Sequence, residues 1–420
     1  MHRHTLRAGA LAALATCAAA AGAAPASTPI EILFVGDSYT FGRVDPVMSY
    51  NAANVHDLTA GFNAINSSGT NAFEPHPWGG VPGIFKEFTT ESGLDYDVSI
   101  SARNAASLRG QFLDTANSTW DLRGNVASRK WNVVVLQDQS DVSLPAGKGK
   151  NANNAQFQAY VNQFVSFIHG GAAQAYTETQ LYGSLANCMA TGLSKTSCGI
   201  QRVIPANTNA SASTQVYLTE TWARPDMSFP HLITTPDPNS PSGEPIVDTS
   251  SAGGQAIQYY TSLGAMSADL HAAFAAEGAA NPGLAGIVPA GDAFQLAVAL
   301  GTVKTSAFYD ANGVFIAPQP GEPLDLWWDD GLHASKYGSY LDALVQFGTI
   351  TGLDPVSLGA NEAAAAALGI SGTDALFLER LAAEDLGMPL SVPEPGNVPL
   401  LAAGLALLGW SARRRRQRHA

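Results

Sequence analysis

Short apolar runs alternate with longer stretches of helical periodicity along most of the chain. The apolar runs, which are typical of buried strands, lie at residues 30–35, 96–101, 131–136, 215–221 and 286–289. Apolar positions spaced as on one face of a helix lie at residues 81–92, 155–169, 255–276 and 335–351. Strands that alternate with helices in this way form a parallel sheet covered on both faces. The pattern therefore predicts an α/β protein, a three-layer α/β/α sandwich around a mainly parallel five-stranded sheet.

Three connections between these elements are long and polar, at residues 45–80, 183–213 and 224–253. Loops of this length are uncommon unless they serve a function. At the carboxyl edge of the sheet they would wall a substrate cleft, and surface decoration is the alternative. After Gly352, the sequences "NEAAAAALGI" and "LFLERLAAEDL" predict helices. This extension, residues 353–390, either packs on the core or acts as a spacer.

The amino terminus has the three parts of a secretory signal peptide. Residues 1–26 combine basic residues, an apolar stretch and a small-residue end. We therefore predict export, which changes how the cysteines are interpreted. After signal removal only Cys188 and Cys198 remain, and in an oxidising compartment such a pair predicts a disulfide. A zinc site would need further ligands, and no nearby histidine or cysteine offers them.

The carboxyl terminus, residues 391–418, contains a Pro-Glu-Pro motif, an apolar stretch and an arginine cluster, in that order. As a helix, the apolar stretch at residues 398–410 would span roughly 20 Å, less than the ~30 Å hydrocarbon core of a membrane. This tripartite tail resembles the PEP-CTERM sorting signal of Gram-negative bacteria. The resemblance implies that an exosortase cuts near the Pro-Glu-Pro, that membrane association is transient, and that the protein ends in the periplasm, at the outer surface or in the extracellular matrix. A permanent membrane anchor is the alternative.

The charge of the chain argues against one class of partner. There are 22 Lys and Arg against 35 Asp and Glu, a formal net charge of −13, and basic residues cluster only at the last few positions. Nothing in this distribution would neutralise phosphates, so we expect no nucleic-acid partner.

The end of the first predicted strand offers a candidate nucleophile. In "ILFVGDSYTFGR" an apolar run stops at Gly36, Asp37 and Ser38. A plain strand-to-loop turn would use the same small residues. The alternative is that Ser38 is a nucleophile at the carboxyl end of the strand, where open parallel sheets place their active sites. Such a serine needs a base, a group that orients the base, and donors for an oxyanion.

The sequence "WWDDGLHASKYGSYLDAL" offers the base and its partner. Asp330 lies three residues before His333, so its carboxylate can accept the Nδ1 proton and leave Nε2 free to take a proton from serine. The pair is a weak signal alone, but it lies just before the last helix of an alternating chain that begins with Gly-Asp-Ser. Other histidines have no acidic partner in a recurring arrangement, and we expect surface or core roles for them: His56, His76, His169, His231 and His271.

These residues resemble the motifs of the SGNH (GDSL-type) hydrolases. The resemblance covers roughly residues 30–352, and we expect one hydrolase domain at residues 28–352. It implies a flavodoxin-like fold, with Ser38 as the nucleophile and with Asp330 and His333 as the other members of a catalytic triad. The Gly-x-Ser-x-Gly motif of the α/β-hydrolases does not occur in the chain.

The two middle motifs of that family are altered. Where the family has Gly-x-Asn-Asp, this chain has "VVVLQDQSD", which puts Gln139 at the asparagine and Gln137 at the glycine. The Gln139 amide can donate to an oxyanion as asparagine does, and fixing a loop is the alternative. Ala105 in "SARNAASLRG" matches a glycine whose N–H is another donor, although alanine disfavours the left-handed backbone that glycine permits. The N–H of Ser38 would be a third donor.

The sequence thus predicts an exported serine esterase that hydrolyses an acyl ester. Acetylated extracellular polysaccharide is the substrate expected from the sorting signal. A mechanism with a serine nucleophile needs no metal or organic cofactor. Two alternatives stay open, namely acyl transfer to a sugar and carbohydrate binding without turnover on the same fold.

Overall fold

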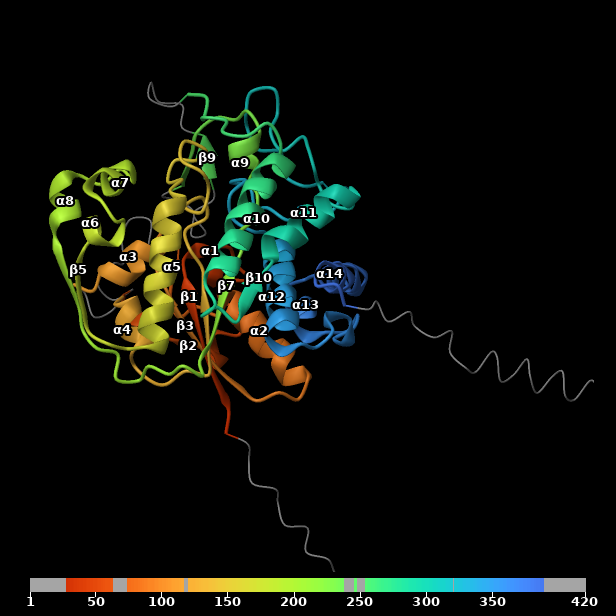
Figure 1. Ribbon diagram of the computed structural model, residues 1–420. Coiled ribbons are helices and arrows are strands. Elements are labelled where there is room, and N and C mark those ends of the chain that lie inside the picture. The colour runs from red at the N-terminus through yellow and green to blue at the C-terminus, as the bar shows by residue number, and fades with distance from the viewer. Residues whose placement is uncertain are drawn as a thin grey trace, which may run out of the picture.

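A parallel sheet forms the middle of the molecule (Figure 1). The computed structural model describes residues 28–62, 74–116, 120–237, 245–247, 254–319 and 321–388. Within them the sheet has six strands in the order β10-β7-β4-β1-β3-β2, and every neighbouring pair is parallel. The strands are β1 (Ile30–Gly36), β2 (His56–Asp57), β3 (Tyr96–Ala102), β4 (Val133–Leu136), β7 (Gln215–Thr219) and β10 (Gly286–Val288).

The sheet confirms the predicted α/β architecture and adds one strand. All five predicted strands are present, at nearly the expected positions. The additional strand, β2, lies at the edge and pairs with β3 through only two residues, His56 and Asp57. Two polar residues show no apolar alternation, so the pattern cannot reveal this strand. The predicted number of five strands is therefore too low.

Three predicted helices are also present near their expected positions, namely α2 (Gly80–Glu91), α5 (Asn154–His169) and α12 (Lys336–Thr351). The fourth, α10 (Leu263–Ala280), begins later than residue 255, because the side chain of Ser262 accepts the N–H of Ala265 and caps the helix there. The pattern does not predict α11 (Ala290–Leu300), which follows β10. The remaining α-helices are α1 (Ser38–Phe41), α3 (Leu108–Leu113), α4 (Leu122–Val126), α6 (Glu178–Leu181), α7 (Leu185–Ala190), α8 (Lys195–Gly199), α9 (Pro225–Ser228), α13 (Ala363–Ala367) and α14 (Gly372–Asp385).

Alternate residues of β1 face two different helical layers. Ile32 and Phe34 belong to an apolar cluster that includes residues of α2, α11 and α12. Leu33 and Val35 belong to a second cluster, with residues of α3, α4 and α5. Both faces of the strand are thus buried, which is why its sequence is apolar throughout. The predicted three-layer sandwich is confirmed.

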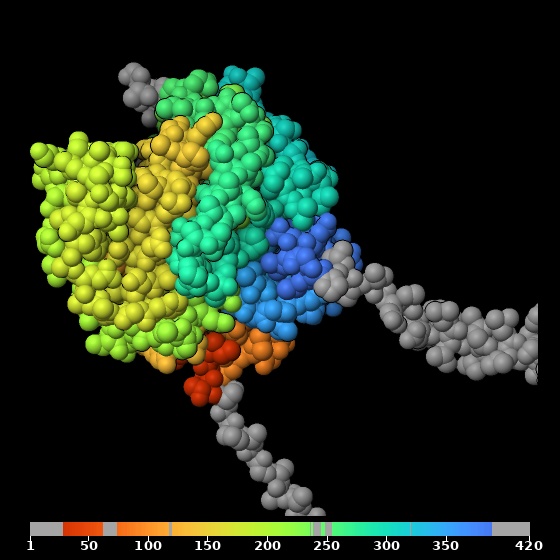
Figure 2. Space-filling view, in the orientation of Figure 1, coloured from red at the N-terminus to blue at the C-terminus, as the bar shows by residue number. Residues whose placement is uncertain are grey.

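The connection that contains the cysteines forms the yellow-green left side of the molecule in Figure 2. Its frame is an antiparallel pair, β5 (Gln174–Thr177) and β6 (Gln201–Ile204), with α6, α7 and α8 between the two strands. Cys188 and Cys198 are buried there and form a disulfide with an S–S distance of 2.04 Å. The predicted disulfide is confirmed.

The extension after Gly352 packs on the core. Ala364 of α13 and Leu378 and Leu381 of α14 are buried in the same apolar cluster as α2 and α12. As far as Met388, packing is therefore confirmed and the spacer interpretation is wrong. The predicted signal peptide, residues 1–26, and the predicted tail, residues 391–418, lie outside the described residues. In the part of the chain that the structure describes, no helix is long and apolar enough to cross a membrane.

Candidate active site

The turn after β1 presents Ser38 as the first residue of α1. Asp37 caps this short helix, because its Oδ1 accepts the N–H of Tyr39 at 3.0 Å. Gln137, just after β4, fixes the turn from the neighbouring strand: its Oε1 accepts the N–H of Asp37 and the hydroxyl of Thr40, each at 2.9 Å. A Cβ at Gly36 would collide with both the Thr40 hydroxyl and Gln137 Oε1, so this approach requires glycine.

His333 and Asp330 meet Ser38 across the fold. His333 Nε2 lies 2.8 Å from Ser38 Oγ, and its Nδ1 lies 2.6 Å from Asp330 Oδ2. The other oxygen of Asp330, Oδ1, accepts the N–H groups of Leu332 and His333, both at 2.9 Å. The carboxylate is thus fixed by its own loop, and it orients the imidazole so that Nε2 faces the serine hydroxyl. The structure brings all three predicted residues together.

The surroundings keep the histidine neutral and the aspartate charged. Burial lowers the pKa of His333 below its usual value, Asp330 opposes this shift, and the cations Arg43 and Arg224 reinforce it. Burial by itself would raise the pKa of Asp330, but its contacts with His333 and Leu332 bring that pKa below its usual value. A neutral imidazole beside a carboxylate is the protonation state that a general base requires.

Aromatic stacking joins the serine turn to the histidine loop. The rings of Tyr39 and Trp222 stack with centroids 4.0 Å apart, and Trp222 stacks on Phe294 at 4.7 Å. The Tyr39 hydroxyl and the Trp222 Nε1–H both donate to the carbonyl of Leu332, at 2.8 and 3.3 Å. Because Leu332 precedes His333, these two bonds set the position of the imidazole relative to Ser38.

The predicted oxyanion residues differ in their surroundings. The amide of Gln137 is engaged at both ends, since its Nε2 donates to the Asp138 carbonyl while its Oε1 accepts from Asp37 and Thr40 of the serine turn. Gln139 is half-buried, and its Nε2 makes only a long 3.5 Å contact with Ser140 Oγ, so its amide is the less constrained of the two. Ala105 adopts φ 52°, the left-handed backbone that its glycine counterpart would favour. The oxyanion role of Gln139 and Ala105 stays a prediction.

Several charged residues of the site have no signal in the sequence. Asp138 Oδ1 accepts the N–H groups of Leu108 and Gln139, at 2.7 and 2.8 Å, and so joins the loops after β3 and β4. Arg224, buried beside the site, donates to Ser140 Oγ at 2.8 Å and from Nε to Asp226 Oδ1 at 2.9 Å. These partners are far apart in the sequence or lie in an irregular loop, so only the fold pairs them.

Three of the other histidines have acidic partners that lie at least 19 residues away in the sequence, so no recurring motif marks them. His56 lies 2.7 Å from Asp97, His76 lies 2.6 Å from Asp57, and His271 lies 2.8 Å from Asp292. The remaining two contact backbone carbonyls: His169 contacts Thr214, and His231 contacts Phe229.

The site lies where the strand order reverses. After β1 the chain forms the edge strand β2 and then β3, both on one side of β1, and it then crosses to β4 on the other side. Ser38 follows β1, and Gln137 to Gln139 follow β4, at the carboxyl ends of these two strands. Open α/β sheets bind ligands at this kind of position.

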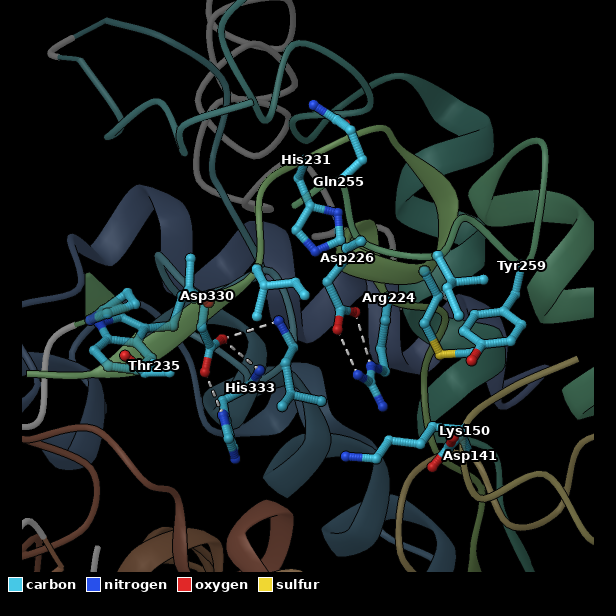
Figure 3. A pocket seen from close by; sticks show the side chains of 18 of the residues that line it. Asp141, Lys150, Arg224, Asp226, His231, Thr235, Gln255, Tyr259, Asp330 and His333 are labelled. Atoms are coloured by element: carbon cyan, nitrogen blue, oxygen red, sulfur yellow. Dashed lines mark hydrogen bonds and ion pairs between the residues drawn. The ribbon is translucent and has the colours of Figure 1, made fainter. Parts of the chain in front are cut away.

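A cavity of about 420 Å³ adjoins His333 and Asp330 (Figure 3). Part of its wall comes from the connection at residues 224–253, including Met227, His231 and Ile233. This connection therefore forms part of a cavity wall, whereas no lining residue comes from residues 183–213 or from the described part of residues 45–80. Charged side chains also line the cavity, among them Arg43, Lys150, Arg224 and Asp226. Figure 3 shows the ion pair between Asp226 and Arg224.

The chain matches no protein-family model and has no significant match among curated proteins. Similar solved structures include "a putative SGNH hydrolase from Slackia heliotrinireducens", with 15% identity, 77% of this chain and 100% of that chain covered, and a TM-score of 0.36. A DUF4886 family protein from Bacteroides uniformis has 12% identity, with 88% and 98% covered and a TM-score of 0.42. TesA has 13% identity, with 77% and 98% covered and a TM-score of 0.27. These likenesses are distant, with identities of 12–15%.

Proposed function

We propose that the protein is a serine hydrolase of the SGNH type that cleaves a carboxylic ester. The observation that supports this most is the chain of contacts from Ser38 Oγ through His333 to Asp330, at 2.8 and 2.6 Å. Serine and histidine are 295 residues apart, so local sequence does not produce their contact. The same order of nucleophile, base and orienting carboxylate serves acyl transfer on unrelated folds.

In the proposed mechanism, Ser38 Oγ attacks the acyl carbon while His333 Nε2 takes the hydroxyl proton. The carbonyl oxygen becomes an oxyanion, for which the N–H groups of Ser38 and Ala105 and the amide of Gln139 are the proposed donors. The ester C–O bond then breaks, and His333 gives its proton to the departing alcohol. A water molecule, deprotonated by His333, attacks the acyl-enzyme and releases the acid and free Ser38.

Asp330 has a positioning function in this mechanism. With Oδ2 on the Nδ1–H of His333, it favours the tautomer in which Nε2 lacks a proton and can accept one. It also stabilises the imidazolium that forms when Ser38 is deprotonated. Because Oδ1 is occupied by two backbone N–H groups, the carboxylate cannot rotate away from the ring without breaking them.

We propose an ester with a small acyl group as the substrate, and an acetylated polysaccharide as its source. The cavity of about 420 Å³ is within the usual size for small ligands, roughly 300–1,000 Å³. Its lining combines apolar side chains such as Met227 and Ile257 with charged and polar ones, as a sugar-bearing ester would require. Processing by an exosortase and a final location outside the inner membrane are part of the same proposal. The disulfide supports export, because disulfides persist in oxidising compartments.

An active-site fluorophosphonate probe tests the nucleophile. Wild-type protein should be labelled and Ser38→Ala should not. Ser140→Ala is the matched control, because Ser140 is equally buried at the same sheet edge but its hydroxyl accepts from Arg224 rather than facing a histidine. Equal labelling of wild type and Ser38→Ala would refute the assignment.

A panel of substrates tests the reaction. Short-chain and long-chain acyl esters and acetylated glycans should be hydrolysed by wild type and not by Ser38→Ala, with the highest kcat/KM for short acyl chains. Acyl transfer to an added sugar in preference to water would favour a transferase. Glycan binding without turnover or labelling would favour a non-catalytic binding protein.

A further inference from the structure

A second cluster of polar side chains lies at the ends of β7 and β10, apart from the serine site. Glu220 follows β7, His271 lies on α10, and Asp292 lies in the first turn of α11. One nitrogen or oxygen atom from each side chain lies within 4.8 Å of those of the other two. The side chains of His271 and Asp292 are 58% and 32% exposed, whereas Glu220 is 2% exposed. The cluster is therefore open to solvent with a buried carboxylate at its base.

The carboxylate of Glu220 is buried without a hydrogen-bond partner for Oε1. The residue is fixed in place, since its N–H donates to the carbonyl of Val288 at 2.9 Å and continues the pairing of β7 with β10. A Cβ at Gly291 would lie 3.0 Å from Glu220 Oε1, so this oxygen faces the first turn of α11, next to Asp292. A buried carboxylate without a partner is unfavourable, and a bound cation removes this cost.

The neighbours of Glu220 add negative charge. Both Asp292 and Asp385, the last residue of α14, act electrostatically on Glu220. Asp385 itself has a buried Oδ2 with no hydrogen-bond partner. Among the ion pairs of the described residues, none joins a lysine or arginine to Glu220, Asp292 or Asp385. Together with Asp385, the cluster thus has three carboxylates and one imidazole, and no lysine or arginine of the described residues forms an ion pair with any of them.

We propose that Glu220, His271 and Asp292 bind one divalent transition-metal ion of the Zn²⁺ class, and that the charge of Asp385 adds to the attraction for the ion. One imidazole nitrogen with two carboxylate oxygens is a donor set typical of Zn²⁺ and similar ions, whereas Ca²⁺ and Mg²⁺ prefer oxygen ligands alone. His271 and Asp292 are partly exposed and can rotate around an ion, while Glu220 stays fixed by its backbone.

The proposed metal has a structural effect, because it would tie β7, α10 and α11 together. Glu220 lies two residues before Trp222, the ring that stacks on Tyr39 beside the nucleophile. Metal binding at Glu220 would therefore stabilise the edge of the sheet that supports the serine site. The metal takes no part in the acyl chemistry proposed above.

Thermal unfolding and equilibrium dialysis of tag-free, chelator-treated protein test the proposal. Zn²⁺ should bind saturably with one ion per chain and, at about a hundredfold excess over Kd, raise the Tm by about 3–8 °C. Ca²⁺ and Mg²⁺ at the same concentration should give a much smaller shift. His271→Ala and Asp292→Asn should weaken Zn²⁺ binding at least about tenfold, and both alter partly exposed side chains, so that folding is preserved. Neither readout depends on esterase activity.

His56→Ala provides a matched control. His56 and Asp97 form a second exposed pair, 2.7 Å apart with side chains 60% and 28% exposed, but their neighbour is Arg129 rather than a buried carboxylate. This variant should bind Zn²⁺ as wild type does. Glu220→Gln, which keeps the size of the side chain and removes its charge, should weaken binding. The absence of one-to-one binding, unchanged affinity in His271→Ala or Glu220→Gln, or equal loss in His56→Ala would overturn the proposal.

Discussion

Replacing Gln137 by alanine tests how the turn that contains Ser38 is held in place. Gln137 is 3% exposed, and its Oε1 accepts from both the N–H of Asp37 and the hydroxyl of Thr40 at 2.9 Å. The substitution leaves these two buried donors without their acceptor, at a cost of about 1–3 kcal/mol each. Because the Thr40 hydroxyl can rotate toward another acceptor, we expect a total loss of about 2–4 kcal/mol in the free energy of unfolding.

Urea unfolding followed by tryptophan fluorescence measures this loss. With an m value of about 3 kcal/mol/M, the midpoint should fall by about 1 M. Gln139→Ala is the comparison, because its side chain is half-buried and makes only one 3.5 Å contact. That variant should lose less than about 1 kcal/mol of stability but about 10²–10³ in kcat if the amide serves the oxyanion. An unchanged midpoint in Gln137→Ala, or an equal drop in both variants, would contradict this account of the turn.

The other predictions concern the triad, its pH dependence and the disulfide. His333→Ala should lower kcat by several orders of magnitude. Asp330→Asn should also lower kcat severely, because the imidazole would be wrongly oriented. A large loss of kcat in Asp329→Asn with a small loss in Asp330→Asn would show that the wrong carboxylate was chosen. Since burial brings the pKa of His333 below its usual value, kcat/KM should rise with pH to a plateau with an apparent pKa below about 6.5, and an apparent pKa clearly above that value would contradict the lowered pKa of His333. Non-reducing mass spectrometry should find Cys188 linked to Cys198. Reduction of this disulfide should lower the free energy of unfolding by roughly 2–3 kcal/mol with little change in kcat. Two alkylatable thiols in native protein would disprove the link.

The parts of the site that the sequence predicts are those defined by local pattern. Ser38 lies in the turn after an apolar strand, and Asp330 and His333 are three residues apart before a capped helix, so each half is visible in a short stretch. The family resemblance supplies the link between the halves. The two-residue strand β2 could not be predicted, because two residues are too few to show an alternation of apolar and polar positions.

The supporting contacts could not be predicted because they join residues that are remote in sequence. Gln137 fixes the turn at Asp37 although the two residues are 100 positions apart in the sequence. The alignment of Gln137 with a family glycine gives no indication of this function. Glu220 and Asp292 likewise approach each other only when β7 and β10 pair side by side. Such residues carry no periodic or motif signal, since their function depends on tertiary structure alone.

The distance of 295 residues between serine and histidine has a consequence for the biogenesis of the protein. A growing chain acquires Ser38 long before His333, and the two can meet only after the segment that contains His333 has been made and has folded against the turn after β1. A chain shortened before residue 333 would therefore be inert toward esters, however well its first strands fold. Ester hydrolysis would then be detectable only in chains in which His333 has reached Ser38. The cell that makes the protein would be protected from this activity until the two residues meet.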